Sequence, residues 1–307
     1  MRPLPRSTWE GLSGWLPIVG LALTACGGAD PAGPSPLPSA HLPPETILAA
    51  GNIASCGSTN DEATASLLDN LSGTIFALGD NAFPDGSAQA YANCYAPSWG
   101  RHLARTYGVL GNREYRSGAP TAAFDYFGDR VGPRDLGYYS LDLGNWHIIV
   151  LNVSDSSAFV AGSAQSKWLA SDLAENRRLC TMVMWHKPRF FSSNIPGWTS
   201  NASMLGLWNQ LYAAGVDVVL NGQQHHYERM RPMSPTGAIG GGRGIRQFSV
   251  GTGGESSEMP IAIAAGSEAI SDAFGVLKLV LGDGAYTWEF VPTVPGQFTD
   301  AGSGACH

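Results

Sequence analysis

Charge of either sign is scarce in this chain. Only 14% of its 307 residues are charged, and the 18 lysines and arginines are outnumbered by 25 aspartates and glutamates, for a net charge of −7. Because an acidic chain without a basic stripe is a poor binder of nucleic acid, we expect no nucleic-acid partner. The 44% of hydrophobic residues and the 39 glycines fit a folded, loop-rich α/β protein rather than a disordered one.

Long hydrophobic runs are missing too. The apolar run from Trp15 to Ala25 is too short to span a bilayer as a stable helix, but after Arg2 and Arg6 it suits the hydrophobic core of an export signal. The sequence LTAC that ends at Cys26 resembles a bacterial lipobox, in which the cysteine is lipidated and becomes the new N-terminus. A plain secretory signal that is cleaved nearby is the alternative.

The N-terminal composition predicts three parts. We expect a lipoprotein-type signal peptide over residues 1–25, a Pro/Gly-rich tether over 26–44 and one folded domain over 45–307. The protein would then be exported, as a bacterial cell-envelope lipoprotein or in periplasmic or extracellular form. It would contact the membrane through its lipid anchor only.

Cysteine is also rare, with five in the whole chain and no C-x-x-C pair, which argues against a structural zinc knuckle. With Cys26 assigned to lipidation, an even number remains, and in an exported protein this suggests two disulfides. The four cysteines allow three pairings, of which we favour Cys56–Cys94 and Cys180–Cys306.

Short apolar runs that end in small or polar residues recur along the domain, and we expect them to be strands buried on both faces. They cover residues 47–50, 74–78, 147–151, 180–185 and 216–220. Helix-like stretches lie between them, at residues 61–71, 88–104, 163–174 and 204–214. This alternation predicts an α/β fold. Three C-terminal runs, 245–250, 275–281 and 286–291, suggest a second sheet packed on the first.

Candidate ligand residues stand where the predicted strands end. In α/β folds, ligands bind beyond the carboxyl ends of the strands, so side chains at these ends are expected to converge. The residues concerned are Asn52, Asp80, His186, Gln223 and His225. Each residue could instead have a purely structural role. Asp80 could be a carboxylate that stabilises a turn, and the histidines could be core residues whose hydrogen bonds are all made within the fold. His102 and His147 are expected to be structural, and His226 and the following Tyr-Glu-Arg are expected to support the site or the fold.

Five segments occur in an order that resembles the calcineurin-like metallophosphoesterases, and within them the purple-acid-phosphatase-like branch. They are GNIASC (51–56), GDNAFPDG (79–86), GNREY (111–115), WHKPRF (185–190) and GQQHHYER (222–229). The resemblance covers nearly all of residues 45–300. It implies a four-layer sandwich of two mixed β-sheets flanked by helices, and an enzyme in which two metals, bridged by one carboxylate, generate hydroxide from water.

The resemblance also shows where this chain departs from the family at the first metal. The bridging carboxylate corresponds to Asp80, and a histidine ligand corresponds to His225. The family's aspartate is replaced by Asn52, and the tyrosinate ligand of the branch is replaced by Phe83.

At the second metal, Asn112 and His186 correspond to retained ligands. Gln223 stands where the family has a ligand histidine, and Arg113 stands where it has the histidine that acts on the leaving group. Because a guanidinium repels a divalent cation, we expect Arg113 to replace the metal's charge by pairing with Asp80, or to contact phosphate. We therefore expect no two-metal centre, and either no metal or one weakly bound Fe, Zn or Mn.

Three functions are compatible with this pattern. The one we favour is a catalytically dead or strongly impaired, lipid-anchored protein that binds a phosphate-like anion or phosphoester, or acts as an interaction module. The second is a metal-dependent phosphomonoester hydrolase that works with a reduced site. The third is a purely structural cell-surface module, for which the pocket would be empty and could be occluded.

Overall fold

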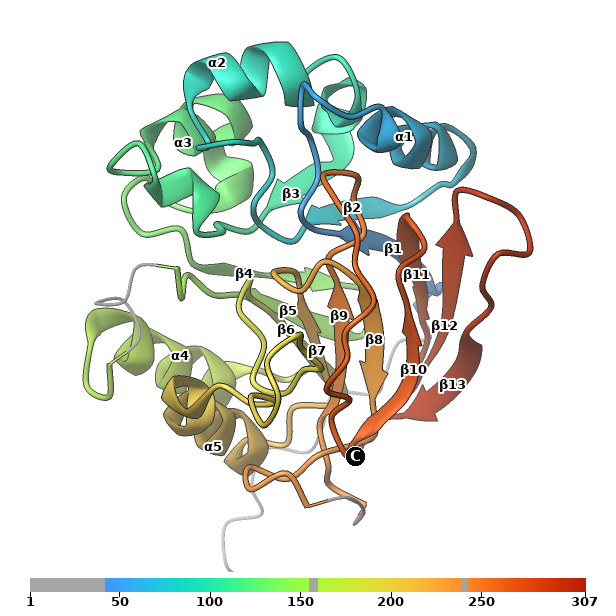
Figure 1. Ribbon diagram of the computed structural model, residues 1–307. Helices are drawn as coiled ribbons and strands as arrows, with labels where there is room; N and C mark the ends of the chain where they lie inside the picture. Colours follow the sequence, from blue (N-terminus) through green and yellow to red (C-terminus); the bar gives the residue numbers. More distant parts are fainter. Residues whose placement is uncertain (1–41, 155–159, 239–241) are drawn as a thin grey trace, which may run out of the picture. The chain divides into compact units, whose positions relative to one another are not determined.

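The structure is a computed structural model that describes residues 42–154, 160–238 and 242–307 (Figure 1). The predicted signal peptide, Cys26 and all of the predicted tether before residue 42 lie outside the described residues. Within the described part of the chain, no helix has both the length and the apolar character needed to cross a bilayer.

One sheet has six strands in the order β13-β12-β11-β1-β2-β3. Its strands are β1 (Glu45–Ala50), β2 (Thr74–Ala77), β3 (Thr106–Gly108), β11 (Gly275–Leu281), β12 (Ala285–Pro292) and β13 (Ala301–Ala305). The first three run parallel to one another, whereas β11, β12 and β13 are added antiparallel to β1 and to each other.

The other sheet has seven strands in the order β10-β8-β9-β7-β6-β5-β4. Its strands are β4 (Tyr139–Leu143), β5 (Trp146–Val150), β6 (Cys180–Met184), β7 (Val218–Asn221), β8 (Tyr227–Met230), β9 (Arg246–Val250) and β10 (Ser267–Ser271). The central strands β5, β6, β7 and β9 are parallel, and the edge strands are antiparallel. Both sheets are therefore mixed, as the family resemblance implies.

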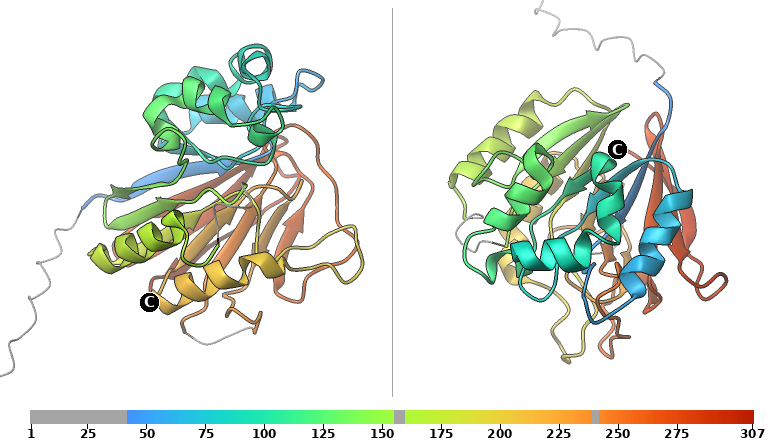
Figure 2. Two further views of the ribbon diagram at one scale, coloured as in Figure 1. Left: turned by 90° about the vertical axis from the view of Figure 1, so that its left-hand side faces the viewer. Right: turned by 90° about the horizontal axis from the view of Figure 1, so that it is seen from above.

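Helices cover the outer faces of the two sheets (Figures 1 and 2). Over the six-stranded sheet lie α1 (Asn60–Asn70), α2 (Ala88–Ala90) and α3 (Thr121–Phe127), and against the seven-stranded sheet lie α4 (Ala164–Glu175) and α5 (Leu205–Ala213). Single helical turns add to them: a π-helical turn at Tyr91–Tyr95, and 3₁₀ turns at Trp99–Arg105, Arg113–Tyr115, Gly128–Val131 and Ala202–Met204. The four-layer arrangement predicted from the sequence is confirmed.

The central strands are dominantly apolar because their alternate residues pack into two different cores. In β5, Ile148 belongs to the core between the two sheets, whereas Ile149 packs with Trp208 and other residues of the α4 and α5 layer. Every residue of β5 and β6 is buried. A strand buried on both faces has no polar face, so the period-two pattern disappears.

Two predictions about secondary structure are wrong. The segment 88–104 is not one helix but α2, the π-helical turn and a separate 3₁₀ turn, since Pro97 cannot supply the backbone N–H that a continuing helix needs. The C-terminal strands do not form a sheet of their own. Instead β9 joins the seven-stranded sheet, and β11 and β12 complete the sheet begun by β1.

Both favoured disulfides are confirmed. Cys56 is bonded to Cys94, which ties the loop after β1 to the π-helical turn. Cys180 is bonded to Cys306, which joins the start of β6 to the residue after β13 and so links the two sheets.

Candidate functional site

The carboxyl ends of parallel strands from both sheets meet at one edge of the sandwich. Asn52 follows β1, Asp80 follows β2, His186 follows β6 and Gln223 follows β7. Hydrogen bonds join these ends. The backbone N–H of Asn52 donates to Gly79 O at 3.0 Å, and Asn52 Nδ2 donates to Gln223 O at 3.1 Å. The expected convergence of these residues is therefore present.

Two motif glycines allow this close approach. A Cβ atom at Gly79 would lie 2.7 Å from His186 Nδ1, and a Cβ atom at Gly222 would lie 2.9 Å from the same nitrogen. Such separations are too short for any larger residue, so the glycines are required for the imidazole of His186 to sit between the two strand ends. Its Nδ1–H donates to the carbonyl oxygen of Leu78 at 2.8 Å, which fixes the ring and directs Nε2 towards Asp80.

Backbone strain is concentrated at the same positions. Asn52, Asp80 and Gln223 have φ angles of 54°, 52° and 63°, in the left-handed region that L-residues rarely adopt. Each such residue costs about 1–2 kcal/mol, somewhat less for Asn and Asp. Residues in this conformation cluster at active and binding sites, and here each one stands at the end of a strand that contributes to the site.

Asp80 is surrounded by donors that belong to the protein itself, and it is only 1% exposed. The backbone N–H of Arg113 donates to Oδ1 at 2.7 Å, and Asn112 Nδ2 donates to Oδ2 at 3.3 Å. Two cationic groups complete the set: His186 Nε2 lies 3.3 Å from Oδ1, and Arg113 Nε lies 3.6 Å from Oδ2.

These contacts determine which groups are charged. Burial on its own would raise the pKa of Asp80, but the charge and hydrogen bonding of His186, together with Arg113, hold it below its usual value. Burial on its own would lower the pKa of His186, but Asp80 raises it instead. The pair therefore favours an aspartate beside an imidazolium.

The guanidinium of Arg113 lies against Phe83, with its central carbon 4.5 Å from the ring centroid. Its Nη1 donates to Pro84 O at 3.1 Å, while the side chain remains 20% exposed. A cation over an aromatic face is stabilised by the ring quadrupole. Phe83 thus supports the arginine at the position where the branch has a metal-bound tyrosinate.

His225 is held by the loop that follows β9. Its Nδ1 lies 2.6 Å from Ser256 Oγ and 3.2 Å from Glu255 Oε2, and its ring meets the edge of Phe83 with centroids 6.4 Å apart. The imidazole is 22% exposed, so it borders the site on the solvent side.

Purple acid phosphatases are found both among the relatives in sequence and among the structural neighbours, although no protein-family model matches the chain. Purple acid phosphatase 15 of Arabidopsis thaliana is 23% identical over 297 residues, which cover 84% of this chain and 54% of that protein. Among solved structures, purple acid phosphatase PPD1 from yellow lupin seeds has a TM-score of 0.67 at 18% identity, over 87% of this chain and 55% of that chain. GAP50, the anchor in the inner membrane complex of Plasmodium, has a TM-score of 0.66 at 13% identity, over 86% of this chain and 89% of that chain.

The comparisons support a resemblance to the purple-acid-phosphatase-like branch of the calcineurin-like metallophosphoesterases, whose fold this chain shares. The plant relative matches over most of this chain, and the structural neighbours share its fold. The chain spans about half, or less, of the length of the curated relatives it matches. Their whole-protein activities are therefore not carried over with the fold.

The side chains present do not fit the two-metal centre of this family. Two divalent ions bring four positive charges, whereas Asp80 is the only carboxylate among the positions that correspond to family ligands. At the first-metal position Phe83 offers no donor atom, and Asn52 replaces an anion with a neutral amide. The fixed charge of Arg113 beside Asp80 adds repulsion.

The second-metal position is closer to a usable donor set. Asp80 contacts both Asn112 and His186, and a carbonyl partner orients the imidazole in the way that ligand histidines are oriented. His186 Nε2 faces Asp80 Oδ1 at 3.3 Å, whereas Asn52 Oδ1 is buried and has no hydrogen-bond partner among the described residues. Asn52 Oδ1 therefore has hydrogen-bonding capacity left for a ligand.

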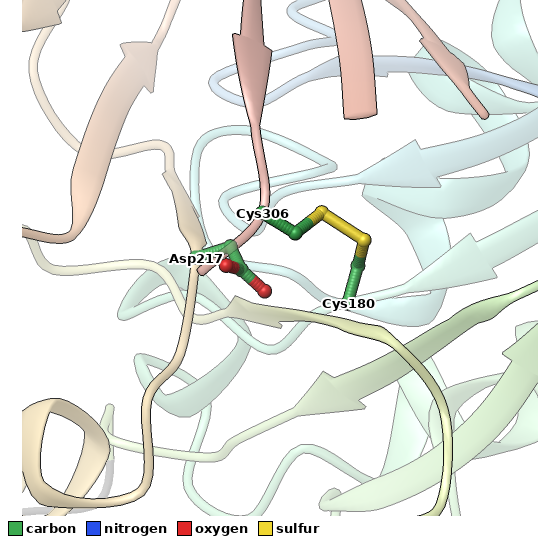
Figure 3. A group of neighbouring side chains, drawn as sticks. All are labelled: Cys180, Asp217 and Cys306. Atoms are coloured by element: carbon green, nitrogen blue, oxygen red, sulfur yellow. A yellow bond between two sulfur atoms is a disulfide. The ribbon is translucent and has the colours of Figure 1, made fainter. Parts of the chain in front are cut away.

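A separate group of metal-type residues, Cys180, Asp217 and Cys306, lies at the other end of β6 and β7 (Figure 3). Its two sulfurs are bonded to each other, and the thiolate is the form that binds metal. Asp217 instead accepts hydrogen bonds from Thr181 N and His307 N, both at 2.8 Å. The group is therefore a structural disulfide cross-link with an adjacent hydrogen-bonded carboxylate, rather than a metal site.

Glu114 is a functional residue that the sequence reasoning missed. It is fully buried, and its carboxylate accepts hydrogen bonds from the backbone N–H groups of Asp80, Asn81 and Gly111 at 3.0, 2.9 and 2.6 Å. It thereby fixes the loops that carry Asp80 and Asn112 relative to each other. Its place next to Arg113 in the GNREY segment is the signal that could have drawn attention to it.

Proposed function

We propose that this protein binds a phosphate-like anion or phosphoester at the Arg113–Asp80 site and is catalytically dead or strongly impaired as a phosphatase. The observation that carries the proposal is the 3.6 Å contact between Arg113 Nε and Asp80 Oδ2, next to the imidazole of His186. In the family, this carboxylate bridges the metals. Here its charge is balanced by the protein's own cations.

Loss of catalysis follows from how the family makes its nucleophile. Hydroxide forms at neutral pH because metal ions lower the pKa of bound water. A guanidinium cannot do this, since it has no open coordination position and remains protonated. Arg113 also stands in place of the histidine that assists the leaving group, and an arginine does not donate a proton at neutral pH.

Anion binding is supported by charge and by access. Arg113 and His186 place two cationic groups beside Asp80, while the buried carboxylate of Glu114 is directed at backbone N–H groups. The guanidinium is partly exposed and offers a planar fork of donors, which suits phosphate oxygens. The partial exposure of Arg113 and His225 argues against a fully occluded site.

An active phosphoesterase with a reduced site is the second candidate. It is favoured by His186, whose Nε2 is directed towards Asp80 by the bond from Nδ1 to Leu78 O, as in a ligand histidine that a carbonyl group orients. One weakly held Fe, Zn or Mn ion could use Asp80, Asn112 and His186, with Gln223 nearby. In our proposal such an ion is absent or weakly bound.

Metal content and turnover separate the two candidates. Protein purified without chelators is analysed for Fe, Zn and Mn, and hydrolysis of a chromogenic phosphomonoester is followed over a wide pH range with each metal added. We expect well below one equivalent of metal, no linear turnover above that of a heat-inactivated control, and saturable binding of inorganic phosphate. Turnover that a chelator abolishes, or two tightly bound metals per chain, would overturn the proposal.

We also propose that the protein is exported and anchored through a lipid on Cys26. The supports are the apolar run from Trp15 to Ala25, the LTAC sequence and the Pro/Gly-rich stretch that follows. The Plasmodium neighbour, described as the anchor in the inner membrane complex, is an example of this fold in a membrane complex. Labelling of the full chain with a palmitate analogue in a bacterial host, compared with Cys26→Ser, tests the anchor, and equal labelling of both would contradict it.

A further inference from the structure

A cavity of ≈ 550 Å³ lies beside the proposed anion site and takes no part in it. Its walls come from the segment after the Arg113 turn, the loop before β4, the carboxyl end of β5 and the start of α4. Its volume is within the range of small-molecule pockets in proteins.

Strand register places this cavity next to His186. Val150 at the end of β5 pairs with Met184 at the end of β6, and the N–H of Leu151 donates to Met184 O at 2.8 Å. Two residues beyond this pair, Asn152, which lines the cavity, follows β5, and His186 follows β6; neighbouring parallel strands lie about 4.8 Å apart.

A second link runs through Tyr115. Its hydroxyl accepts a hydrogen bond from Asn152 Nδ2 at 2.6 Å. Tyr115 also ends the 3₁₀ turn that begins at Arg113. The cavity and the guanidinium are thus connected through one rigid turn.

The cavity walls have a distinct chemistry. Tyr115, Tyr138, Pro120 and Leu136 contribute aromatic and apolar surface. Among the lining side chains only Asp135 is charged, and it is exposed at this site.

Asn152 supplies a buried acceptor. Its side chain is used as a donor to Tyr115 Oη and Leu136 O, whereas Oδ1 has no hydrogen-bond partner among the described residues, although Asn152 is only 4% exposed. Unpaired buried acceptors are uncommon in native proteins and call for an explanation, of which a ligand is one.

We propose that this cavity binds a planar heteroaromatic ring that carries an amino group, of which adenine is a simple biological example. The ring would stack on the tyrosines, and its N–H groups would donate to Asn152 Oδ1 and to the carboxylate of Asp135. The negative charge of Asp135 disfavours a phosphate inside the cavity. A ligand that has both parts would therefore direct its phosphate to Arg113, and this last step rests on the proposed function.

The test measures binding of adenosine to the purified chain by calorimetry, with two matched variants of α4. Ala164 lines the cavity and Ala170 does not, and both are exposed alanines of the same helix. We expect saturable binding that Ala164→Trp weakens by about tenfold or more, because the indole fills the cavity, while Ala170→Trp changes it less than about twofold.

A change of ligand tests the hydrogen bond without altering the protein. Purine riboside has the same ring system without the amino group, and we expect it to bind about fivefold to tenfold more weakly than adenosine. Equal affinities for the two nucleosides, equal effects of the two tryptophan variants, or no saturable adenosine binding at millimolar concentrations would each overturn the proposal.

The same experiment distinguishes this proposal from the anion site. Inorganic phosphate reports on Arg113 alone, and adenosine reports on the cavity alone. Adenosine 5′-monophosphate that binds more tightly than either probe would support the combined ligand. If it binds no more tightly than adenosine, the ring site stands and the link to Arg113 is wrong.

Discussion

Arg113 contacts Asp80 through two different groups: its backbone N–H donates to Oδ1 at 2.7 Å, and its side-chain Nε lies 3.6 Å from Oδ2. The backbone contact depends only on the loop, so a histidine at this position could make it equally well. The side-chain contact requires the guanidinium. The loop can therefore keep the family's geometry while the charge at its tip has changed from a titratable group to a permanent cation.

This relationship predicts the effect of removing the guanidinium. Arg113→Gln keeps the backbone contact but deletes the charge, so we expect phosphate binding to weaken by about tenfold or more, or roughly 1.4 kcal/mol. Calorimetric titration with inorganic phosphate at low ionic strength measures it. Arg116→Gln is the matched control, because Arg116 is exposed in the same segment, and it should leave the affinity within about twofold. Equal losses in both variants would indicate a general charge effect and contradict the site.

Restoring the family's ligands should restore the metal. The combined variant Asn52→Asp, Phe83→Tyr, Arg113→His and Gln223→His supplies one new carboxylate, one phenol and two imidazoles at strand ends that already converge. We expect it to bind close to two equivalents of metal and to gain chelator-sensitive phosphomonoesterase activity.

Elemental analysis and a chromogenic assay, with the unmodified chain as reference, measure both outcomes of this restoration. The variant must first show the circular dichroism and cooperative unfolding of the parent. A folded variant that binds no metal would show that the scaffold has changed beyond these four positions.

The sequence indicated the central strands well because they are buried on both faces. β5, β6 and β7 are dominantly apolar, and this pattern depends on local residues alone. β8 was missed because its charged residues are neutralised from far along the chain: Arg229 pairs with Asp300 and Glu268. Such partners cannot be read from a local pattern, so the YERM segment did not look like a strand.

At the site, too, the residues in sequence motifs were predicted, whereas those whose roles depend on distant parts of the chain were not. Asp80, His186 and Gln223 were located through the family motifs, and the structure brings them together at the strand ends. Glu114 was missed because its role depends on three backbone N–H groups supplied by two separate loops. Asn152 was missed because the position of β5 beside β6 is a matter of strand order, which the sequence does not give.

The two disulfides should differ in their contribution to stability. Their cysteines are 38 and 126 residues apart, and a longer closed loop restricts the unfolded chain more. The loop-entropy relation gives about 4 kcal/mol for Cys56–Cys94 and about 5 kcal/mol for Cys180–Cys306. Urea unfolding of the paired Cys→Ser variants, each compared with the parent, measures this order. A larger loss for Cys56–Cys94 would show that strain or structure in the unfolded chain outweighs loop length.

His147 predicts a dependence of stability on pH that is independent of the anion site. Its Nδ1 and Nε2 each lie 2.8 Å from a carboxylate oxygen, of Asp142 and Asp172 respectively. Burial on its own would lower the pKa of His147, but hydrogen bonds and charge from these two aspartates raise it. The stabilisation is therefore complete below the unfolded pKa of about 6.5 and is lost as the pH rises through the raised folded value.

At the acid end, Asp142 sets the limit. Burial raises the pKa of Asp142, but His147 and Arg178 lower it more. The contribution of Asp142 to stability is therefore present above its unfolded pKa and is lost as the pH falls through its lowered folded pKa.

We expect His147→Gln to cost about 1–2 kcal/mol near pH 5.5, a modest value because Asp142 is 41% exposed. Thermal unfolding of the parent and of the variant should therefore differ most near this pH and converge as the pH rises through the raised folded pKa of His147. His102→Gln is the control, since burial lowers the pKa of His102 and its difference from the parent should not shrink in the same direction. A gap for His147→Gln that stayed constant from pH 5.5 to pH 9 would mean that packing, not the charge of the imidazolium, accounts for the stabilisation.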